Sequence, residues 1–280
     1  MGKFKDITNK RYEKLVVKKY LGGSKWLCDC DCGNTVNVRT ADLNNGHTKS
    51  CGCLLKKYNL DDTYFDDIDT QEKAYILGMF SADAAITYKP YNIKLELKSD
   101  DEDILEKIKI AMNYDFDVKH YQNKCKTENY NYICNTSRLN ITNKNIVLKL
   151  ADYGIVPRKS NVLDFDFNKI PKEYHSHYLR GLWDGDGTIS FNTNRKTPQP
   201  TMNLTSSTTM IQSIVKLLKE NFEINPYLYN RRENNVDNTT MVVGKQQDIK
   251  KILEFLYKDA NIYLDRKYEK YIECKKLLSM

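Results

Sequence analysis

The chain has 280 residues, 40% of them hydrophobic and 29% charged, so it can bury a core and is not a disordered polymer. Its apolar runs are shorter than the roughly 20 residues that span a bilayer, and its N-terminus lacks the apolar block of a secretory signal, so we expect a cytoplasmic protein with no membrane partner. Its net charge of +7 favours a polyanionic partner.

The first 57 residues are basic and rich in cysteine, with 12 Lys and Arg against 5 Asp and Glu. Two tight thiol groups, "CDCDC" and "CGC", separated by a loop of about 20 residues, are typical of a tetrahedral zinc site. Reduced core cysteines are the alternative. Five thiols compete for four positions, and Cys28 is left over if "CDCG" and "CGC" form the two knuckles. The candidate ligands are Cys28, Cys30, Cys32, Cys51 and Cys53. We therefore expect a zinc-binding module over residues 1–57.

An acidic segment follows at residues 58–72, where "DDTYFDDIDTQE" has six acids and no base, and we expect it to act as a linker. The chain then repeats itself. "AYILGMFSADAAI" and "HYLRGLWDGDGTI" superpose without a gap, so that Gly78 matches Gly181 and Asp83 matches Asp186. Two copies separated by the length of a small domain indicate two related repeats. We place these repeats at residues 73–160 and 161–280.

The segments after each signature also repeat. Alternation and β-branched or aromatic residues indicate strands, and three- and four-residue apolar spacing indicates helices. The expected strands are 84–89, 91–98, 117–125 and 129–142, then 187–192, 201–206, 226–232 and 238–244. The expected helices between and after them are 99–112, 145–154, 208–222 and 246–260. Ser99, and Ser207 or Thr208, are suited to cap the middle helices. The pattern predicts an α+β protein made of two tandem αββαββα repeats.

Each repeat closes on the same basic pair after its last expected helix. "YGIVPRK" ends at Arg158 and Lys159, and "NIYLDRK" ends at Arg266 and Lys267. A single pair of this kind is usually solvated surface, but its recurrence at matching places favours a functional role.

The second signature poses an electrostatic problem. A helix C-terminus carries a negative partial charge and favours Lys or Arg, yet this one ends in Asp184 and Asp186. We expect a positive group beside at least one of them.

The signatures "YILGMFSADA" and "YLRGLWDGDG" resemble the paired helices of single-chain LAGLIDADG homing endonucleases, and the resemblance covers residues 73–280. It implies a pseudo-symmetric monomer in which the two helices pack side by side, with two antiparallel sheets that bind DNA. It implies a site-specific endonuclease of a mobile genetic element that cuts both strands of double-stranded DNA. The abundance of Lys, Asn, Tyr and Ile suggests an AT-rich bacterial or phage genome.

The resemblance also implies an active site. One carboxylate from each repeat would help to hold Mg²⁺ or Mn²⁺ between the helix ends. The implied metal site is Asp83, Asp186, Ala82 and Gly185. Lys159 and Lys267 would stabilise charge near the attacking water and the phosphate. Ser81 stands where the second signature has Asp184, and this inequality leaves nicking of a single strand open.

DNA reading would come from polar residues on the strands, because Arg and Asn recognise base edges and Lys grips phosphate. In the first repeat the candidates are Lys94, Lys119, Tyr121, Asn123, Lys126 and Arg138. In the second they are Arg195, Lys196, Asn203, Asn230, Arg231, Arg232 and Thr240. Each of these residues taken alone could equally be a solvated residue of a sheet face.

The cysteine-rich segment resembles small zinc modules that precede nucleases in phages and mobile elements. It could extend the DNA contact or serve only as a folding staple. Two other functions stay open for the whole chain. A maturase would bind intron RNA, and a non-cleaving DNA-binding regulator would have no use for both aspartates.

Overall fold

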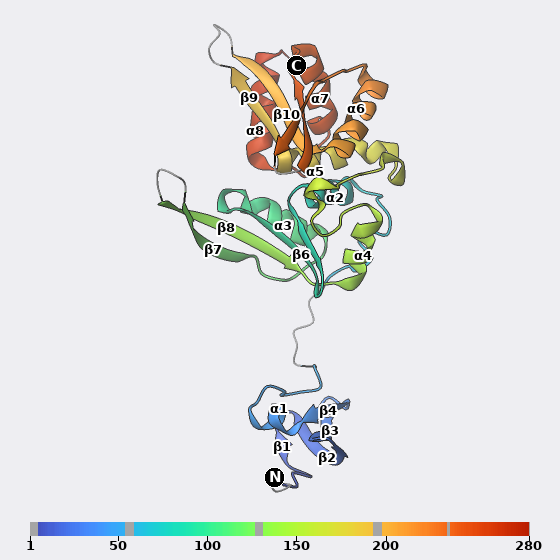
Figure 1. The fold of residues 1–280 in the computed structure, drawn as a ribbon, viewed down its shortest axis with the longest axis vertical. Coiled ribbons are helices and arrows are strands. Elements are labelled where there is room, and N and C mark those ends of the chain that lie inside the picture. The colour runs from blue at the N-terminus through green and yellow to red at the C-terminus, as the bar shows by residue number, and fades with distance from the viewer. Residues whose placement is uncertain (1–4, 54–58, 127–130, 193–197, 234–235, 280) are drawn as a thin grey trace. The chain divides into compact units, whose positions relative to one another are not determined.

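A computed structural model describes residues 5–53, 59–126, 131–192, 198–233 and 236–279. The chain folds as two compact units, Met1–Tyr58 and Asn59–Met280 (Figure 1). Within the described ranges, no helix is both long and apolar enough to cross a membrane.

The first unit is a small antiparallel sheet with a short helix. Its elements are β1 (Arg11–Tyr12), β2 (Leu15–Gly22), β3 (Lys25–Cys30), β4 (Thr35–Arg39) and α1 (Thr40–Asn44), with the strands in the order β1-β2-β3-β4. Alternate residues of neighbouring strands, such as Leu15, Val17 and Trp26, are buried in a core of their own. This alternation is the pattern of a sheet with one buried face.

The first repeat of the second unit consists of a helix, two strands, a helix, two strands and a helix. These are α2 (Gln71–Asp83), β5 (Ala85–Tyr88), β6 (Tyr91–Lys98), α3 (Glu102–Ala111), β7 (Lys119–Lys126), β8 (Asn131–Ile141) and α4 (Lys144–Asp152). The four strands form an antiparallel sheet in the order β5-β6-β8-β7. Single 3₁₀ turns precede α3 and connect the repeats, at η1 (Ser99–Asp101), η2 (Lys159–Asn161), η3 (Phe167–Lys169) and η4 (Lys172–Tyr174).

The second repeat has the same order and one further helix. Its elements are α5 (His175–Asp186), β9 (Gly187–Asn192), β10 (Gln199–Ser207), α6 (Thr208–Phe222), β11 (Tyr227–Glu233), β12 (Val236–Val243), α7 (Gln246–Tyr257) and α8 (Asp265–Leu277). Its sheet has the order β11-β12-β10-β9. The expected tandem αββαββα fold is therefore confirmed, whereas α8 is an addition that the sequence pattern did not predict.

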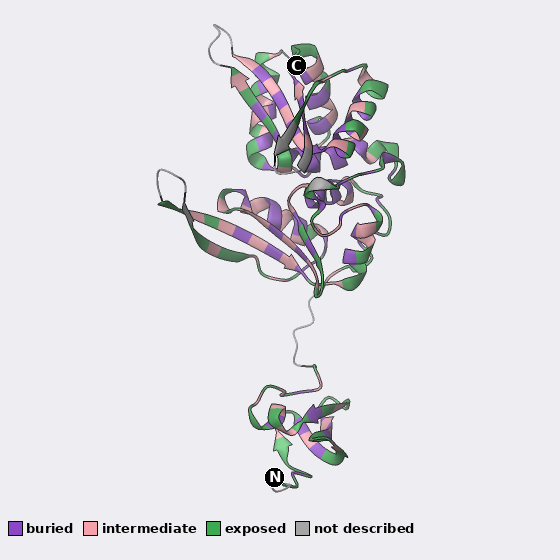
Figure 2. Ribbon diagram, in the orientation of Figure 1, coloured by how far each residue is buried: buried purple, intermediate pink, exposed green. Residues whose placement is uncertain are grey.

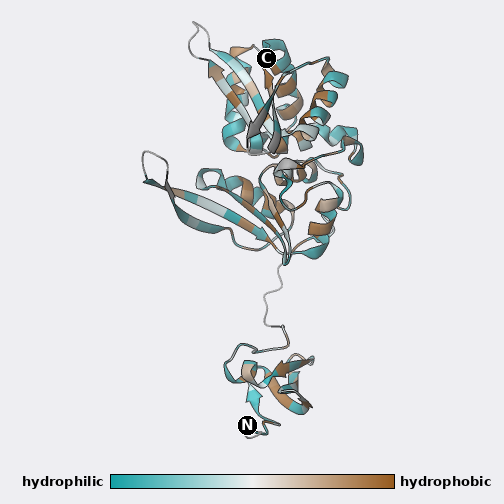
Figure 3. Ribbon diagram, viewed as in Figure 1, coloured by the Kyte–Doolittle hydropathy of each residue, from teal (hydrophilic) through white to brown (hydrophobic). Residues whose placement is uncertain are grey.

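Each sheet buries one face against helices and leaves the other face open. Ile93 and Leu95 of β6 are buried, and so are Met202 and Leu204 of β10, while the residues between them are only partly covered (Figure 2). The helix α6, on the buried face of the second sheet, mixes apolar and polar segments along its length (Figure 3) and buries apolar residues at three- and four-residue spacing, such as Met210, Ile214 and Leu217. In each sheet, the first strand begins directly after a helix: β5 after α2, and β9 after α5.

Two local expectations need correction, and one holds. Ser207 caps α6, because its hydroxyl accepts a bond of 3.2 Å from the backbone N–H of Met210. Ser99 instead begins the η1 turn and does not cap α3. The acidic segment is not a free linker, because Phe65 and Ile68 are buried in the core of the second unit.

Candidate nuclease centre and zinc site

The signature helices α2 and α5 touch through their backbones. A Cβ atom on Gly78 would overlap the carbonyl oxygen of Tyr178, and one on Gly181 would overlap that of Tyr75. Any larger side chain at either glycine would have to push the helices apart, and packed cores tolerate such overpacking poorly. The glycines therefore bring the C-terminal ends of the two helices together.

Those ends place the two signature aspartates beside each other. A Cβ atom on Gly185 would lie 2.8 Å from Oδ2 of Asp83, so the penultimate residue of α5 directly faces the last residue of α2. Burial and then the charge of Asp83 raise the pKa of Asp186 to about 7, while Lys159 and Lys267 act in the opposite direction. Burial also raises the pKa of Asp83. The carboxylates thus form one charged centre with lysines around it.

The two lysines expected at this centre lie there, one from each repeat. Lys159 is 5% exposed and its Nζ donates a bond of 2.8 Å to the carbonyl oxygen of Ala82. Lys267 is 6% exposed and its Nζ donates to the carbonyl oxygen of Gly187. Each lysine is therefore tied to the end of its own signature helix. Their settings differ from the expectation in one respect: Lys159 begins the η2 turn, whereas Lys267 lies in the first turn of α8.

Burial affects the charge of both ammonium groups. It lowers the pKa of Lys159, against the attraction of Asp186 and Asp83. It also lowers the pKa of Lys267, to about 8, with a further contribution from Arg266. Loss of hydration disfavours a charged amine, and a nearby anion restores it.

The neighbouring arginines are not equivalent. Arg266 donates through Nε to both oxygens of Asp101, at 2.9 and 3.1 Å, and so joins the second repeat to the start of α3 in the first. Arg158 is exposed and adopts a left-handed backbone conformation, with φ of 59°.

The positive groups that we expected beside at least one of the two aspartates lie near Asp186, where Lys159 and Lys267 act on it. Asp184 is bonded to neutral groups. It is fully buried, and its oxygens accept bonds from the hydroxyls of Tyr257 at 2.5 Å and Tyr75 at 2.8 Å, and from the backbone N–H of Leu264 at 2.8 Å. Among the described residues no Lys or Arg forms an ion pair with it. The buried Arg180 lies near it and donates to backbone carbonyls instead. Three neutral donors thus stabilise this carboxylate.

The first repeat has a smaller version of the same arrangement. The hydroxyl of Tyr178 donates to Ser81 over 2.9 Å, and Ser81 donates to the carbonyl oxygen of Leu77 over 2.9 Å. Each signature tyrosine therefore reaches across to the polar residue of the other helix, Tyr75 to Asp184 and Tyr178 to Ser81. The matching tyrosines were visible in the sequence, but their role was not.

The open face of the first sheet collects five of the six candidates for DNA contact in that repeat. The register pairs Lys119 with Arg138, Tyr121 with Thr136, and Asn123 with Cys134. It also pairs Lys94 with Asn140, which shares the alternation of Arg138. The candidates on this face are Lys94, Lys119, Tyr121, Asn123 and Arg138. The sixth, Lys126, pairs with Asn131, and its side chain is outside the described part of the chain.

The second sheet agrees less well with the expectation. Asn203 lies on the open face, but Thr240 is only 3% exposed and its hydroxyl is 2.8 Å from that of Thr205. Asn230 was wrongly placed on this face: it accepts a bond from the buried Thr239, whose hydroxyl also contacts Thr208 at the start of α6. The side chains of the other four candidates lie outside the described part of the structure: Arg195, Lys196, Arg231 and Arg232.

A family model described as LAGLIDADG-like domain matches the chain twice, at residues 70–153 and 173–256. These two matches contain both signature helices and both sheets. The chain belongs to this family.

No curated protein matched the chain. Among solved structures, the LAGLIDADG homing endonuclease I-GzeII in complex with its DNA target is similar to it, with 14% identity and a TM-score of 0.50 over 74% of this chain and 89% of that one. I-WcaI bound to its DNA recognition sequence has 15% identity and a TM-score of 0.49 over 77% and 90% of the two chains. I-LtrWI bound to target DNA has 12% identity and a TM-score of 0.48 over 79% and 91%. The likeness to I-GzeII shows the LAGLIDADG fold.

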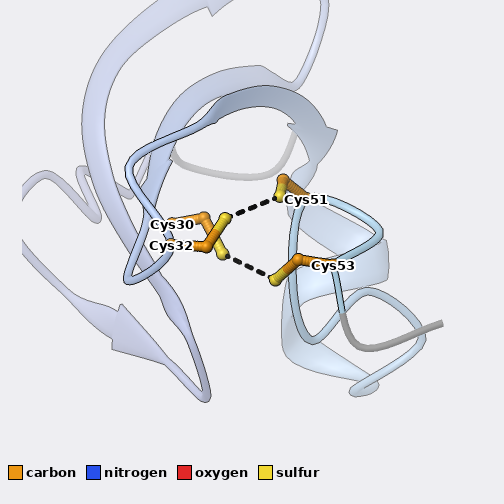
Figure 4. Close-up of side chains that lie close together, drawn as sticks. All are labelled: Cys30, Cys32, Cys51 and Cys53. Carbon is orange, nitrogen blue, oxygen red and sulfur yellow. Dashed lines mark hydrogen bonds between the residues drawn. The ribbon is translucent and has the colours of Figure 1, made fainter. Parts of the chain in front are cut away.

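The LAGLIDADG matches begin at residue 70, and a second site lies in the unmatched first unit. The thiol sulfurs of Cys30, Cys32, Cys51 and Cys53 all lie within 4.8 Å of one another. The sulfurs of Cys30 and Cys53 are 3.5 Å apart, and those of Cys32 and Cys51 are 3.3 Å apart (Figure 4). One pair of cysteines comes from the end of β3 and the turn after it, and the other from the loop after α1, with their sulfurs pointing inward.

The fifth candidate ligand, Cys28, is outside this cluster. It is fully buried in the core of the first unit, and its sulfur lies 3.8 Å from the carbonyl oxygen of Trp26. Burial raises the pKa of its thiol, whereas backbone N–H groups of Cys32 and Cys51 lower that of Cys30. Within the cluster the shifts are not alike, because the bond with Cys30 raises the pKa of Cys53. Position, and not pKa, separates the four clustered thiols from Cys28, which the spacing already marked as spare.

Proposed function

We propose that the chain is a site-specific, metal-dependent endonuclease that hydrolyses phosphodiester bonds of double-stranded DNA. The observation that carries the proposal is the pair of carboxylates, Asp83 and Asp186, at the touching ends of α2 and α5. A DNA-binding protein that does not cut would gain nothing from two adjacent acids, because carboxylates repel phosphate. The family membership and the DNA complexes of the solved relatives support the same function.

The donors at the helix ends fit a divalent cation. Burial and the charge of Asp83 make ionisation of Asp186 unfavourable, and a cation between the two would relieve both effects. Carboxylate and carbonyl oxygens are ligands that Mg²⁺ accepts while it keeps several waters. Asp83 and Asp186 would hold Mg²⁺ or Mn²⁺, with the carbonyls of Ala82 and Gly185 beside them. When bound, such a cation activates water and stabilises the leaving oxygen.

The two lysines supply fixed positive charge at the same centre. Lys159 and Lys267 are held by backbone carbonyls and are largely removed from solvent. A charge in such a setting acts more strongly than one in water and needs no rearrangement during the reaction. We assign them to stabilisation of the phosphate and of the attacking water, one lysine to each repeat. Both repeats lie in one chain, so a monomer contains a complete site.

The function is tested by incubating the full chain and Mg²⁺ with a library of randomised DNA duplexes and sequencing the cut ends. We expect cleavage at one family of related sites and no cleavage in EDTA. Retention of duplexes without cleavage in Mg²⁺ or Mn²⁺ would instead indicate a DNA-binding regulator, and selective retention of intron RNA would indicate a maturase.

We propose further that Cys30, Cys32, Cys51 and Cys53 bind one structural zinc ion. A tetrahedral ion with Zn–S bonds of about 2.3 Å requires sulfurs about 3.8 Å apart, and the four thiols already approach this spacing. The basic charge of the first unit supports a role in DNA contact as well, because Lys and Arg neutralise phosphate.

We expect Cys30→Ser to lose the zinc and to unfold the first unit, because structural zinc contributes on the order of 10 kcal/mol to the folding of small modules. Cys28→Ser is the matched control, because Cys28 lies on β3 two residues before Cys30 but is outside the cluster. Metal analysis of the purified chains should give one zinc in the wild type and in Cys28→Ser, and none in Cys30→Ser. Full zinc content in Cys30→Ser would refute the assignment.

A further inference from the structure

An acidic side chain lies in the middle of the basic open face of the first sheet. Glu96 of β6 accepts bonds through Oε2 from Nε and Nη2 of Arg138 on β8, at 3.1 and 2.9 Å. The same oxygen accepts from Lys94 at 3.3 Å, and Oε1 accepts from Thr136 at 2.9 Å. Glu96 is thus held by three donors from two strands.

Arg138 is equally constrained. Its guanidinium carbon lies over the ring of Tyr121, 4.0 Å from the ring centroid, while its Nε and Nη2 bond to Glu96. The side chains of Arg138 and Glu96 remain 25% and 21% exposed. Burial acts to raise the pKa of Glu96, but the bonds from Thr136, Lys94 and Arg138 hold it below its usual value. Both groups are therefore charged, oriented and reachable from the open face.

The second repeat has no such pair at the equivalent place. In the first repeat, Ala85 of β5 lies two residues after Asp83 and pairs with Lys94 of β6. In the second repeat, Thr188 of β9 lies two residues after Asp186 and pairs with Asn203 of β10. Two residues further along β6 is Glu96, which pairs with Arg138 of β8. The equivalent residue of β10 is Thr205, which pairs with Thr240 of β12. The threonine hydroxyls bond to each other at 2.8 Å. One half of the molecule thus presents an ion pair where the other presents two hydroxyls.

Stability of the sheet accounts for only part of the pair. Arg138 bonds to Glu96 through two nitrogens in a network with Lys94, yet both side chains stay 25% and 21% exposed on the face that the helices do not cover. A carboxylate at this place also repels DNA phosphates and reduces the charge of the face. A specific hydrogen-bond donor of the ligand would explain why an acid is there.

The major groove presents a donor at every base pair, N4–H₂ of cytosine or N6–H₂ of adenine, so the acceptors beside the donor decide which pair fits. Guanine presents the acceptors O6 and N7, which suit arginine, and cytosine presents the donor N4–H₂, which suits glutamate. At an A·T pair the arginine would meet the N6–H₂ donor of adenine, and the glutamate would meet the O4 acceptor of thymine. In the opposite placement, the arginine would meet O4 of thymine and the glutamate N6–H₂ of adenine, which also pairs donors with acceptors. Guanine, however, offers the forked arginine two acceptors where thymine offers one, so the pair favours G·C.

We propose that Arg138 and Glu96 together read one G·C base pair, with Arg138 bonding to the guanine and Glu96 to N4 of the cytosine. Glu96 occupies two of the five guanidinium N–H donors, and the others are available to the base. Along the ladder, Glu96 lies beyond Lys94 on the side of Asp83, so the base pair belongs to the part of the half-site next to the cleavage position. This inference rests on the proposed DNA-binding function.

The experiment is a cleavage profile in which every base pair of the selected target site is varied in turn. For the wild type we expect a G·C preference of about 5- to 150-fold at one position of a single half-site. Arg138→Met and Glu96→Gln should both flatten that position and leave preferences at distant positions unchanged. Thr205→Val is the matched control in the other half, and it should retain the G·C preference.

Two outcomes would overturn the reading. One is a profile in which neither variant changes the preference at any G·C position. The other is a uniform gain in affinity and in salt dependence in Glu96→Gln without a change of preference, which would make the acid a purely electrostatic element. If the wild type binds duplexes but does not cut, the proposed catalysis fails instead. The same variants are then compared in a binding selection, which tests the reading without cleavage.

Discussion

Asp186→Asn is expected to abolish cleavage of both strands while leaving affinity for target DNA nearly unchanged. The asparagine keeps the size of the side chain at the end of α5 but removes the charge that, with Asp83, would hold the cation. Binding should survive because contacts with phosphate supply most of the affinity of proteins for DNA. Single-turnover cleavage in Mg²⁺ and equilibrium binding in Ca²⁺ measure the two quantities separately.

The matched control is Asp259→Asn, which removes the same charge from an exposed position after α7. It should cut at the rate of the wild type. Circular dichroism and thermal unfolding of both variants should show that the fold is kept. Cleavage of both strands by Asp186→Asn at the wild-type rate would exclude Asp186 from the metal site and would remove the main support for the proposed chemistry.

The parts of this centre that the sequence predicted are those encoded by its repetition. Gly78 and Gly181 recur at the same place in two apolar helices, and small residues at matching places indicate close helix packing. The structure bears this out, because a side chain at either glycine would overlap the opposite backbone. The same alignment makes Asp83 and Asp186 equivalent, and the resemblance to the LAGLIDADG family implied that their helices pack side by side and bring them together.

The supporting contacts could not be predicted, because they join residues that only the tertiary fold brings together. Asp184 is bonded to Tyr75 and Tyr257, which are far from it in the chain. Local rules treat an aspartate at a helix C-terminus as unfavourable and so predicted a positive group beside Asp184 or Asp186. Lys159 and Lys267 act on Asp186, whereas buried hydroxyl and backbone donors bond to Asp184, and no periodicity in the sequence encodes which aspartate receives which partner.

The last helix illustrates a different limit. Residues 265–277 are strongly polar, and α8 buries Lys267, Tyr271 and Cys274. One of these three residues is a lysine, and the other two give the segment too few apolar positions for periodicity to mark a helix, so the helix was missed. Alternation in strands likewise gives two faces but does not say which is open at an edge. Asn230 was placed on the wrong face for this reason.

Each of the two buried lysines is bonded to the end of one signature helix. Lys159 bonds to Ala82 in the first repeat and Lys267 bonds to Gly187 in the second. If each stabilises the transition state at the nearer phosphate, losing one should slow one strand by a factor of about 10² to 10³. We therefore expect Lys159→Met to accumulate DNA nicked in one strand and Lys267→Met to accumulate DNA nicked in the other.

The measurement is strand-resolved cleavage under single turnover, with a different label on each strand and enzyme in excess. Lys270→Met is the control, because Lys270 lies on α8 in an exposed pair with Glu273 and should affect neither strand. Lysines that only contact DNA phosphates would behave differently. Their loss would weaken binding, reduce its salt dependence and slow cleavage of both strands equally. Equal slowing of the two strands in both lysine variants would therefore assign Lys159 and Lys267 to DNA binding. Opposite strand preferences in the two variants would show that each lysine supports the cleavage of one strand.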